Sequence, residues 1–84
     1  SIEKLSLNQI KQINYPFFKK ISDEIYKKAQ DKDGYYCSSS GNYRSKYRMH
    51  FEIDHIISLS KGGLTTIQNL QLLSRWENRK KGLL

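Results

Sequence analysis

Four polar residues in the second half of the sequence carry side chains that could together hydrolyse a phosphodiester: Asp54, His55, Asn69 and Asn78. Carboxylate and amide oxygens are hard ligands suited to Mg²⁺, which keeps several waters and accepts phosphate oxygens. A neutral histidine, whose unperturbed pKa is about 6.5, can take a proton from water near neutral pH. Each residue alone also has a structural explanation, as a packed histidine, a turn-forming asparagine or an exposed helix residue. Their order along the chain is what favours one joint site.

Positive charge is concentrated in the same half of the chain. The 84 residues carry a formal net charge of +7, and residues 43–84 contain most of the excess. A basic cluster beside Tyr43 and Tyr47 suits phosphate neutralisation with aromatic contact to sugar or base, and the plainer alternative is a solvated surface. The candidate nucleic-acid contacts are Arg44, Lys46, Arg48, Lys61, Arg75, Arg79, Lys80 and Lys81.

Length and composition exclude several classes of protein. The chain is long enough for one domain only, and aromatic residues at 12% are too frequent for a disordered basic tail. The single cysteine excludes an internal disulfide framework and a multi-cysteine zinc site. No apolar run approaches the roughly 20 residues needed to span a bilayer, and no hydrophobic signal segment opens the chain. We therefore expect a cytoplasmic domain without a membrane partner.

The first 34 residues are predicted to be mainly helical. Ser6 and Gln9 have the spacing of a capping box, which predicts a short helix over about 6–14. Pro16 suits the first turn of a second helix, and Gly34 is expected to end that helix. An apolar stripe runs along it and should supply a core: Phe17, Ile21, Ile25 and Ala29, with Phe18 alongside.

The remaining residues predict short strands and one final helix. Residues 50–57 alternate between apolar and polar side chains, and residues 70–73 form a second short apolar segment, so we expect a two-stranded hairpin with a loop over 58–66. A second capping box, Ser74 with Glu77, predicts a helix that begins at about residue 75. Residues 35–37 are expected to form a further short strand, Trp76 to lie in the core, and Cys37 to be a buried or partly buried free thiol.

The position of the last helix decides whether the candidate site can form. If that helix folds back over the hairpin, it brings Asn78 beside Asp54 and His55. Adjacent residues of a regular strand point to opposite faces. Asp54 and His55 can therefore share one site only if the strand bends or ends there.

The sequence resembles the motif of the HNH nucleases in three segments that have the same order and spacing: 51–63, 69–73 and 78–82. This resemblance implies an α+β fold in which N-terminal helices pack on a ββα-metal motif, a β-hairpin crossed by a helix around one divalent ion. The whole chain, 1–84, would then be a single HNH nuclease domain. Within it, residues 1–34 would be helical support and residues 35–84 the ββα-metal core.

The resemblance also implies a role for each motif residue. His55 matches the general base, Asp54 the metal ligand before it, and Asn78 the last motif position, which is also a metal ligand. Asn69 matches the central asparagine, a member of the catalytic set that ties the loop down and orients the histidine. This H-N-N form would use one divalent ion, with Mg²⁺ expected and Mn²⁺ or Ni²⁺ as substitutes, and would leave 5′-phosphate and 3′-hydroxyl ends.

One departure from the family pattern concerns zinc. Many members hold a structural zinc with two Cys-x-x-Cys pairs, and the four corresponding positions here are Cys37, Ser40, Ser74 and Glu77. With one cysteine left, no structural zinc is expected. The N-terminal helices should replace it by adding a core to a motif too small to fold alone.

The expected function is metal-dependent hydrolysis of DNA, with double-stranded DNA as the expected substrate. Two alternatives stay open: a non-catalytic DNA-binding module on the same scaffold, and a toxin-type nuclease domain with an acidic inhibitor as partner. The sequence also leaves open whether RNA is the substrate and whether a dimer makes double-strand cuts. It likewise leaves open whether the chain is part of a larger restriction or homing endonuclease.

Overall fold

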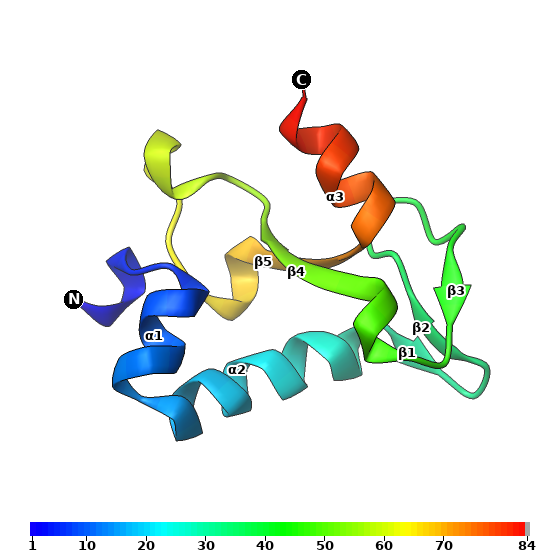
Figure 1. Cartoon of the computed structure of the whole chain (residues 1–84), viewed down its shortest axis with the longest axis horizontal. Coiled ribbons are helices and arrows are strands. Elements are labelled where there is room, and N and C mark those ends of the chain that lie inside the picture. Colours follow the sequence, from blue (N-terminus) through cyan, green and yellow to red (C-terminus); the bar gives the residue numbers. More distant parts are fainter. Residues whose placement is uncertain (84) are drawn as a thin grey trace.

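The computed structural model describes residues 1–83, and Leu84, the last residue of the predicted core segment, lies outside them. The fold is mixed α+β, with three helices and two small antiparallel sheets (Figure 1). No described helix has the length and apolar character needed to cross a bilayer. The elements are α1 (Leu7–Ile13), α2 (Tyr15–Lys28), β1 (Gln30–Asp31), β2 (Gly34–Tyr36), β3 (Arg44–Ser45), β4 (Phe51–His55), β5 (Leu70–Ser74) and α3 (Arg75–Gly82).

Local sequence signals set the starts of α1 and α2 as predicted. The Ser6 hydroxyl accepts from the backbone N–H of Gln9, and the Gln9 side chain accepts from the backbone N–H of Ser6, so the capping box is complete. Pro16 lies in the first turn of α2, where its missing N–H costs no hydrogen bond. These caps fix where both helices begin.

The end of α2 differs from the prediction. The helix stops at Lys28, and Gly34 belongs to β2, which pairs with β1 in a tight hairpin. Gly34 has φ of +122°, and a Cβ there would come within 2.7 Å of the Ser45 carbonyl oxygen on the facing strand. Glycine is therefore required for strand packing at this position, and it does not cap the helix.

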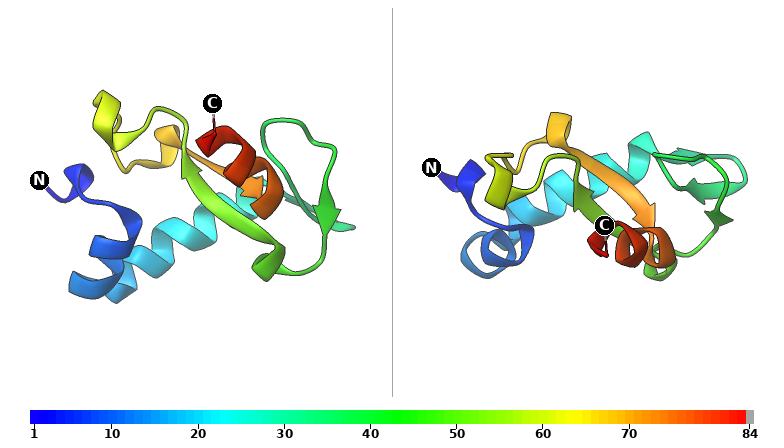
Figure 2. Two further views of the ribbon diagram at one scale, coloured as in Figure 1. Left: turned by 45° about the horizontal axis from the view of Figure 1, so that its top comes forward. Right: turned by 90° about the horizontal axis from the view of Figure 1, so that it is seen from above.

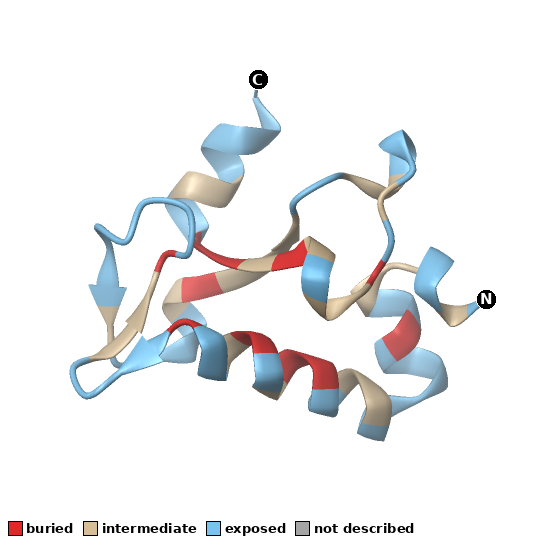
Figure 3. Cartoon of the chain, turned by 180° about the vertical axis from the view of Figure 1, so that it is seen from behind, coloured by how far each residue is buried: buried red, intermediate tan, exposed pale blue. Residues whose placement is uncertain are grey.

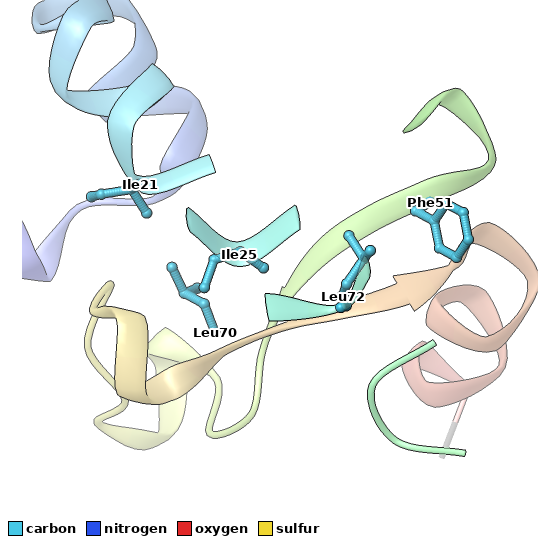
Figure 4. Packing of buried hydrophobic residues seen from close by; sticks show 6 residues of the cluster. Ile21, Ile25, Phe51, Leu70 and Leu72 are labelled. Atoms are coloured by element: carbon cyan, nitrogen blue, oxygen red, sulfur yellow. The ribbon is translucent and has the colours of Figure 1, made fainter. Parts of the chain in front are cut away.

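The β4–β5 hairpin lies between α2 and α3 (Figures 1 and 2). Its register pairs Phe51 with Ser74 and His55 with Leu70. The face toward α2 forms the core, with Ile21 and Ile25 packed on the hairpin, and the buried residues follow this interface (Figures 3 and 4). The buried cluster consists of Ile21, Ile25, Ala29, Phe51, Leu70 and Leu72. The predicted stripe on α2 is thus confirmed as the core that the hairpin needs.

The opposite face of the hairpin carries the polar residues of β4 and is crossed by α3. Glu52 and Asp54 both contact side chains of this helix. Because β4 alternates, Phe51 enters the core while Glu52 faces α3. The fold therefore brings the first motif segment and the last one together.

Trp76 is not part of the core, contrary to the sequence prediction. Its side chain is 68% exposed. On α3, Asn78 and Arg79 are turned toward β4, and Glu77 is turned toward the segment after β2. These contacts use the sides of α3 that face the rest of the fold, and Trp76 lies outside them, with its ring in solvent.

Candidate active site

Asp54 and His55 share one cleft because β4 ends at His55. The cleft has a volume of about 390 Å³, and Asn78 and Lys61 also line it. The chain leaves the strand at Ile56, whose N–H donates to the Asn69 carbonyl oxygen. The termination of the strand resolves the conflict between two neighbouring side chains that would otherwise point to opposite faces.

A buried threonine fixes the imidazole of His55. His55 Nε2 lies 2.8 Å from Thr65 Oγ1, and the Thr65 hydroxyl donates to the Leu5 carbonyl oxygen. A hydroxyl has one proton, and this one is given to Leu5, so Nε2 must donate to Thr65. In the neutral ring the lone pair then lies on Nδ1, which is the nitrogen able to accept a proton.

The surroundings of His55 favour its neutral form. Burial is the main cause that lowers the pKa of His55 below its usual value of 6.5, and the nearby Lys81 ammonium lowers it further. The Asp54 carboxylate acts in the opposite direction and raises the pKa. The net decrease leaves the ring uncharged near neutral pH.

Asn69 closes the loop between β4 and β5. Its Oδ1 accepts from the Ile57 N–H at 2.9 Å, and its Nδ2 donates to the carbonyl oxygens of Ile57 and Leu64, each at 2.9 Å. Both amide protons are used within the loop. Gly63 lies against the same carbonyl, because a Cβ there would come within 1.8 Å of the Ile57 oxygen. Asn69 therefore holds the backbone that follows His55.

Asp54 is held by two donors from different elements. Gln71, its partner across the strand pair, donates from Nε2 to Asp54 Oδ2 at 3.1 Å. Lys81 of α3 forms an ion pair with the same oxygen and donates to the His55 carbonyl oxygen at 2.7 Å. The carboxylate side chain is only 17% exposed. A cationic group thus already faces this carboxylate.

Asn78 reaches the cleft with its amide oriented by Glu52. Its Nδ2 donates to Glu52 Oε1 at 2.9 Å, and Arg79 contacts the same oxygen at 3.0 Å. The Asn78 hydrogen bond is the main cause that lowers the pKa of Glu52, with Arg79 adding to it. With Nδ2 engaged, Asn78 Oδ1 accepts from no donor within residues 1–83.

The eight predicted nucleic-acid contacts divide into two groups in space. Lys61 and Lys81 line the cleft, and the other basic residues of α3 lie on the same helix as Asn78 and Lys81. Arg48 lies away from the cleft, where it pairs with Asp23 of α2 at 2.8 Å and stacks on the Tyr26 ring. Arg44 pairs with Asp31 of β1, and the exposed Lys46 follows β3. The structure brings together the cleft and α3 residues, and it does not bring the residues around β3 to them.

The four positions that correspond to zinc cysteines meet in the structure. The Glu77 carboxylate accepts from Cys37 Sγ at 3.0 Å and from Ser40 Oγ at 3.0 Å, with Ser39 as a third donor at 3.1 Å. Ser74 caps α3 by accepting from the Glu77 N–H at 3.1 Å. The capping box predicted for Ser74 and Glu77 is therefore only half right: the carboxylate is drawn to the Cys37 segment and does not return to the Ser74 N–H.

Sequence reasoning missed Thr65, Gln71 and the orientation of Asn78 by Glu52. Thr65 and Gln71 are common polar residues whose role depends on contacts across the fold. Because side chains alternate along a strand, the sequence does predict that Glu52 shares the Asp54 face of β4. This alternation is the one sequence signal that points toward the contact of Glu52 with α3.

Within residues 1–83, no group of three or more His, Cys, Asp or Glu side chains is placed to hold a metal ion. Asp54 and Asn78 nevertheless line one cleft with two oxygen-bearing side chains. A divalent ion there would have two protein oxygens, with further positions left to water and phosphate, which is the usual environment of Mg²⁺.

Comparison with known protein families agrees with this geometry. The family model of the HNH endonucleases matches residues 35–82, more than half of the chain. No curated protein and no solved structure matches the chain. The matched segment begins in β2 and ends with α3, so it includes the hairpin, the closed loop and every residue of the cleft except Ser6. The chain therefore belongs to the HNH endonuclease family.

Proposed function

We propose that this protein is a metal-dependent endonuclease that hydrolyses DNA phosphodiester bonds, with His55 as general base. Family membership supports a nuclease that acts on nucleic acid. The observation that carries the finer proposal is the meeting of Asp54, His55 and Asn78 in one cleft. A binding module would not need a base beside two oxygen ligands.

The residues of the cleft fit a divalent ion. Asp54 supplies an anionic oxygen, and the hydrogen bond from Asn78 Nδ2 to Glu52 leaves Asn78 Oδ1 as the amide atom available to a cation. HNH nucleases generally use a divalent ion, and we propose Mg²⁺, with Mn²⁺ or Ni²⁺ as substitutes. Such an ion, when bound, stabilises negative charge on the phosphate and on the leaving oxygen.

His55 would remove the proton from the attacking water. Thr65 holds Nε2–H, so Nδ1 is the basic nitrogen, and burial favours the uncharged ring. Asn69 keeps the following backbone closed, which holds the imidazole at the end of β4. The proposed products are a 5′-phosphate and a 3′-hydroxyl.

Basic side chains would hold the DNA backbone over the cleft. Lys61 lines the cleft directly, and α3 presents Arg75, Arg79, Lys80 and Lys81 along its length. Contacts of this kind position a phosphate backbone and do not select bases. We propose Arg44, Lys46 and Arg48 as outer contacts only, because none of them lines the cleft, and Arg44 and Arg48 pair with carboxylates of β1 and α2.

We also propose that the chain acts as one domain. The hairpin buries its apolar face against α2, and Thr65 is tied to Leu5 in the N-terminal segment. Residues 1–34 would thus support both the core and the orientation of His55.

The test is cleavage of plasmid and single-stranded DNA with Mg²⁺, Mn²⁺, Ni²⁺ or EDTA. His55→Ala should lower the cleavage rate by about 10²- to 10⁴-fold and leave DNA binding nearly unchanged. His50→Ala is the matched control, since His50 is the only other histidine and contacts Ser45, outside the cleft. Wild-type cleavage by His55→Ala would exclude this base, and DNA binding without cleavage with any of the metals would favour the binding module.

A further inference from the structure

On α3 the ammonium group of Lys80 lies over the exposed aromatic ring of Trp76. The Trp76 side chain is 68% exposed, and Lys80 Nζ lies 5.0 Å from the centre of its ring. The two residues are one helical turn apart, so they project in the same direction from the helix. The ring therefore presents a large flat apolar surface to the solvent, against which a planar group can stack.

A groove runs along this side of α3. It has a volume of about 400 Å³, and its lining includes the apolar Trp76 and Leu73 and the polar Ser39 and Ser40. It also contacts Gln71 and Lys81, the two residues that donate to Asp54. The groove therefore adjoins the proposed metal ligand from the β5 side of the helix.

The charges around the groove leave Lys80 available for an anion. Arg75 and Arg79 pair with Glu52, and Lys81 pairs with Asp54. Lys80 has no carboxylate within salt-bridge distance among residues 1–83. The one acidic residue of the groove, Glu77, is held by Cys37, Ser39 and Ser40, and the nearby Lys80 ammonium also favours its ionised form. The exposed pair on α3 is thus one cation beside one flat ring.

We propose that Trp76 and Lys80 form a subsite for one unpaired nucleotide of the nucleic acid held in the cleft. A nucleotide is an anion joined to a flat ring, so its phosphate matches Lys80 and its base matches the face of Trp76 that the Lys80 ammonium does not cover. In an intact duplex both faces of each base are covered by neighbouring pairs. The subsite therefore selects single-stranded DNA or duplexes with a frayed or unpaired base next to the cleaved bond.

This subsite deepens the proposed nuclease function and rests on it, but its test does not require cleavage. Trp76 is the only tryptophan of the chain, so its fluorescence reports contact with a base directly. The wild type is titrated, in EDTA, with a single-stranded oligonucleotide, its full duplex and an abasic strand of the same length. The single strand should quench the fluorescence strongly, and the abasic strand should bind through its phosphates with little quenching.

Variants of Trp76 change the stacking surface and leave the charge of Lys80 in place. Trp76→Leu should weaken binding of the single strand about tenfold, whereas Trp76→Phe should retain most of the affinity. Tyr15→Leu is the matched control, because Tyr15 is an aromatic residue 54% exposed on α2, and it should bind like the wild type. Circular dichroism checks that each variant is folded, which the exposure of both side chains leads us to expect.

The outcomes distinguish this inference from the nuclease proposal. The subsite would be overturned if the duplex and the abasic strand quenched the Trp76 fluorescence as strongly as the single strand does. It would also be overturned if Trp76→Leu bound the single strand with wild-type affinity. Both conclusions would hold even if the protein cleaves DNA. Selective quenching in a protein that cleaves nothing would support the subsite and contradict the nuclease.

Discussion

Nε2 of His55 lies 2.8 Å from the hydroxyl oxygen of Thr65, and that hydroxyl donates to the carbonyl of Leu5. This short chain of hydrogen bonds joins the proposed base to the segment before α1. The HNH match begins only at residue 35, so the Leu5 end of the relay lies outside it. The N-terminal segment therefore supplies a hydrogen-bond acceptor to the residues that hold His55, as well as residues to the core.

Removal of the Thr65 hydroxyl should impair catalysis more than binding. Thr65→Val keeps the shape but leaves Nε2–H and the Leu5 carbonyl unpaired, which frees the ring to change tautomer. We expect the rate of cleavage to fall about 10- to 100-fold, as for other residues that orient an active-site group, with little change in KM. Nitrogen-15 NMR of His55 should show the loss of a single tautomer.

Thr65→Ser is the control for that experiment, because it restores the hydroxyl without the methyl group. It should recover most of the rate and the original tautomer. A rate for Thr65→Val equal to that of the wild type would mean that the hydroxyl does not position His55.

The two adjacent glycines of the loop should respond differently to alanine. Gly63→Ala places a Cβ within 1.8 Å of the Ile57 oxygen and close to the Asn69 amide, so the loop must open. We expect a loss of about 3 kcal/mol or more in the free energy of unfolding. Gly62 has φ of +90° with open space around it, and alanine there should cost only about 1 kcal/mol. Urea unfolding of both variants measures the difference, and similar losses would contradict the role assigned to Gly63.

Local and periodic features of the sequence predicted much of this fold. The Ser6–Gln9 capping box, the apolar stripe on α2 and the alternation along β4 all depend on residues close together in the chain, and all three are observed. The motif spacing likewise predicted that Asp54, His55 and Asn78 would meet, because a hairpin crossed by a helix leaves few other arrangements.

The missed features depend on contacts between distant segments. Glu77 lies at a capping position, but the Cys37 thiol and two serine hydroxyls offer its carboxylate three donors, which one backbone N–H cannot match. Trp76 has the largest side chain near the helix start, yet burial depends on which face of α3 meets the hairpin, and Asn78 and Arg79 occupy that face. Neither outcome is encoded in local spacing.

The Glu77 cluster predicts a specific acid dependence of stability. The Cys37 hydrogen bond is the main cause that lowers the pKa of Glu77 below its usual 4.5. The ionised carboxylate therefore stabilises the fold above the pKa of the unfolded chain, and this contribution is lost as the pH falls through the lowered folded-state pKa. Glu77→Gln should be less stable than the wild type near pH 7 and lose less stability on acidification.

Urea midpoints across the acid range provide the measurement. The two proteins should converge as the pH falls through the lowered folded-state pKa of Glu77. Glu24→Gln serves as the charge-matched control, since Glu24 lies exposed on α2. A constant difference between Glu77→Gln and the wild type over the whole range would show that the cluster acts through shape and not through charge.

Lys81 should compete with a divalent ion for Asp54. Its ammonium pairs with Asp54 Oδ2 and also donates to the His55 carbonyl, so it must leave this oxygen before the carboxylate can hold a metal there. Lys81→Met removes the competing charge and keeps the apolar stem of the side chain. We expect it to bind Mn²⁺ about tenfold more tightly, as measured by calorimetry or by electron paramagnetic resonance without DNA.

Lys20→Met, on the exposed face of α2, changes the net charge equally and should bind Mn²⁺ only slightly more tightly than the wild type. Asp54→Asn should abolish the binding in every background, which shows that the ion measured is the one in the cleft. If Lys81→Met binds Mn²⁺ no more tightly than Lys20→Met, the ammonium and the metal do not share this carboxylate.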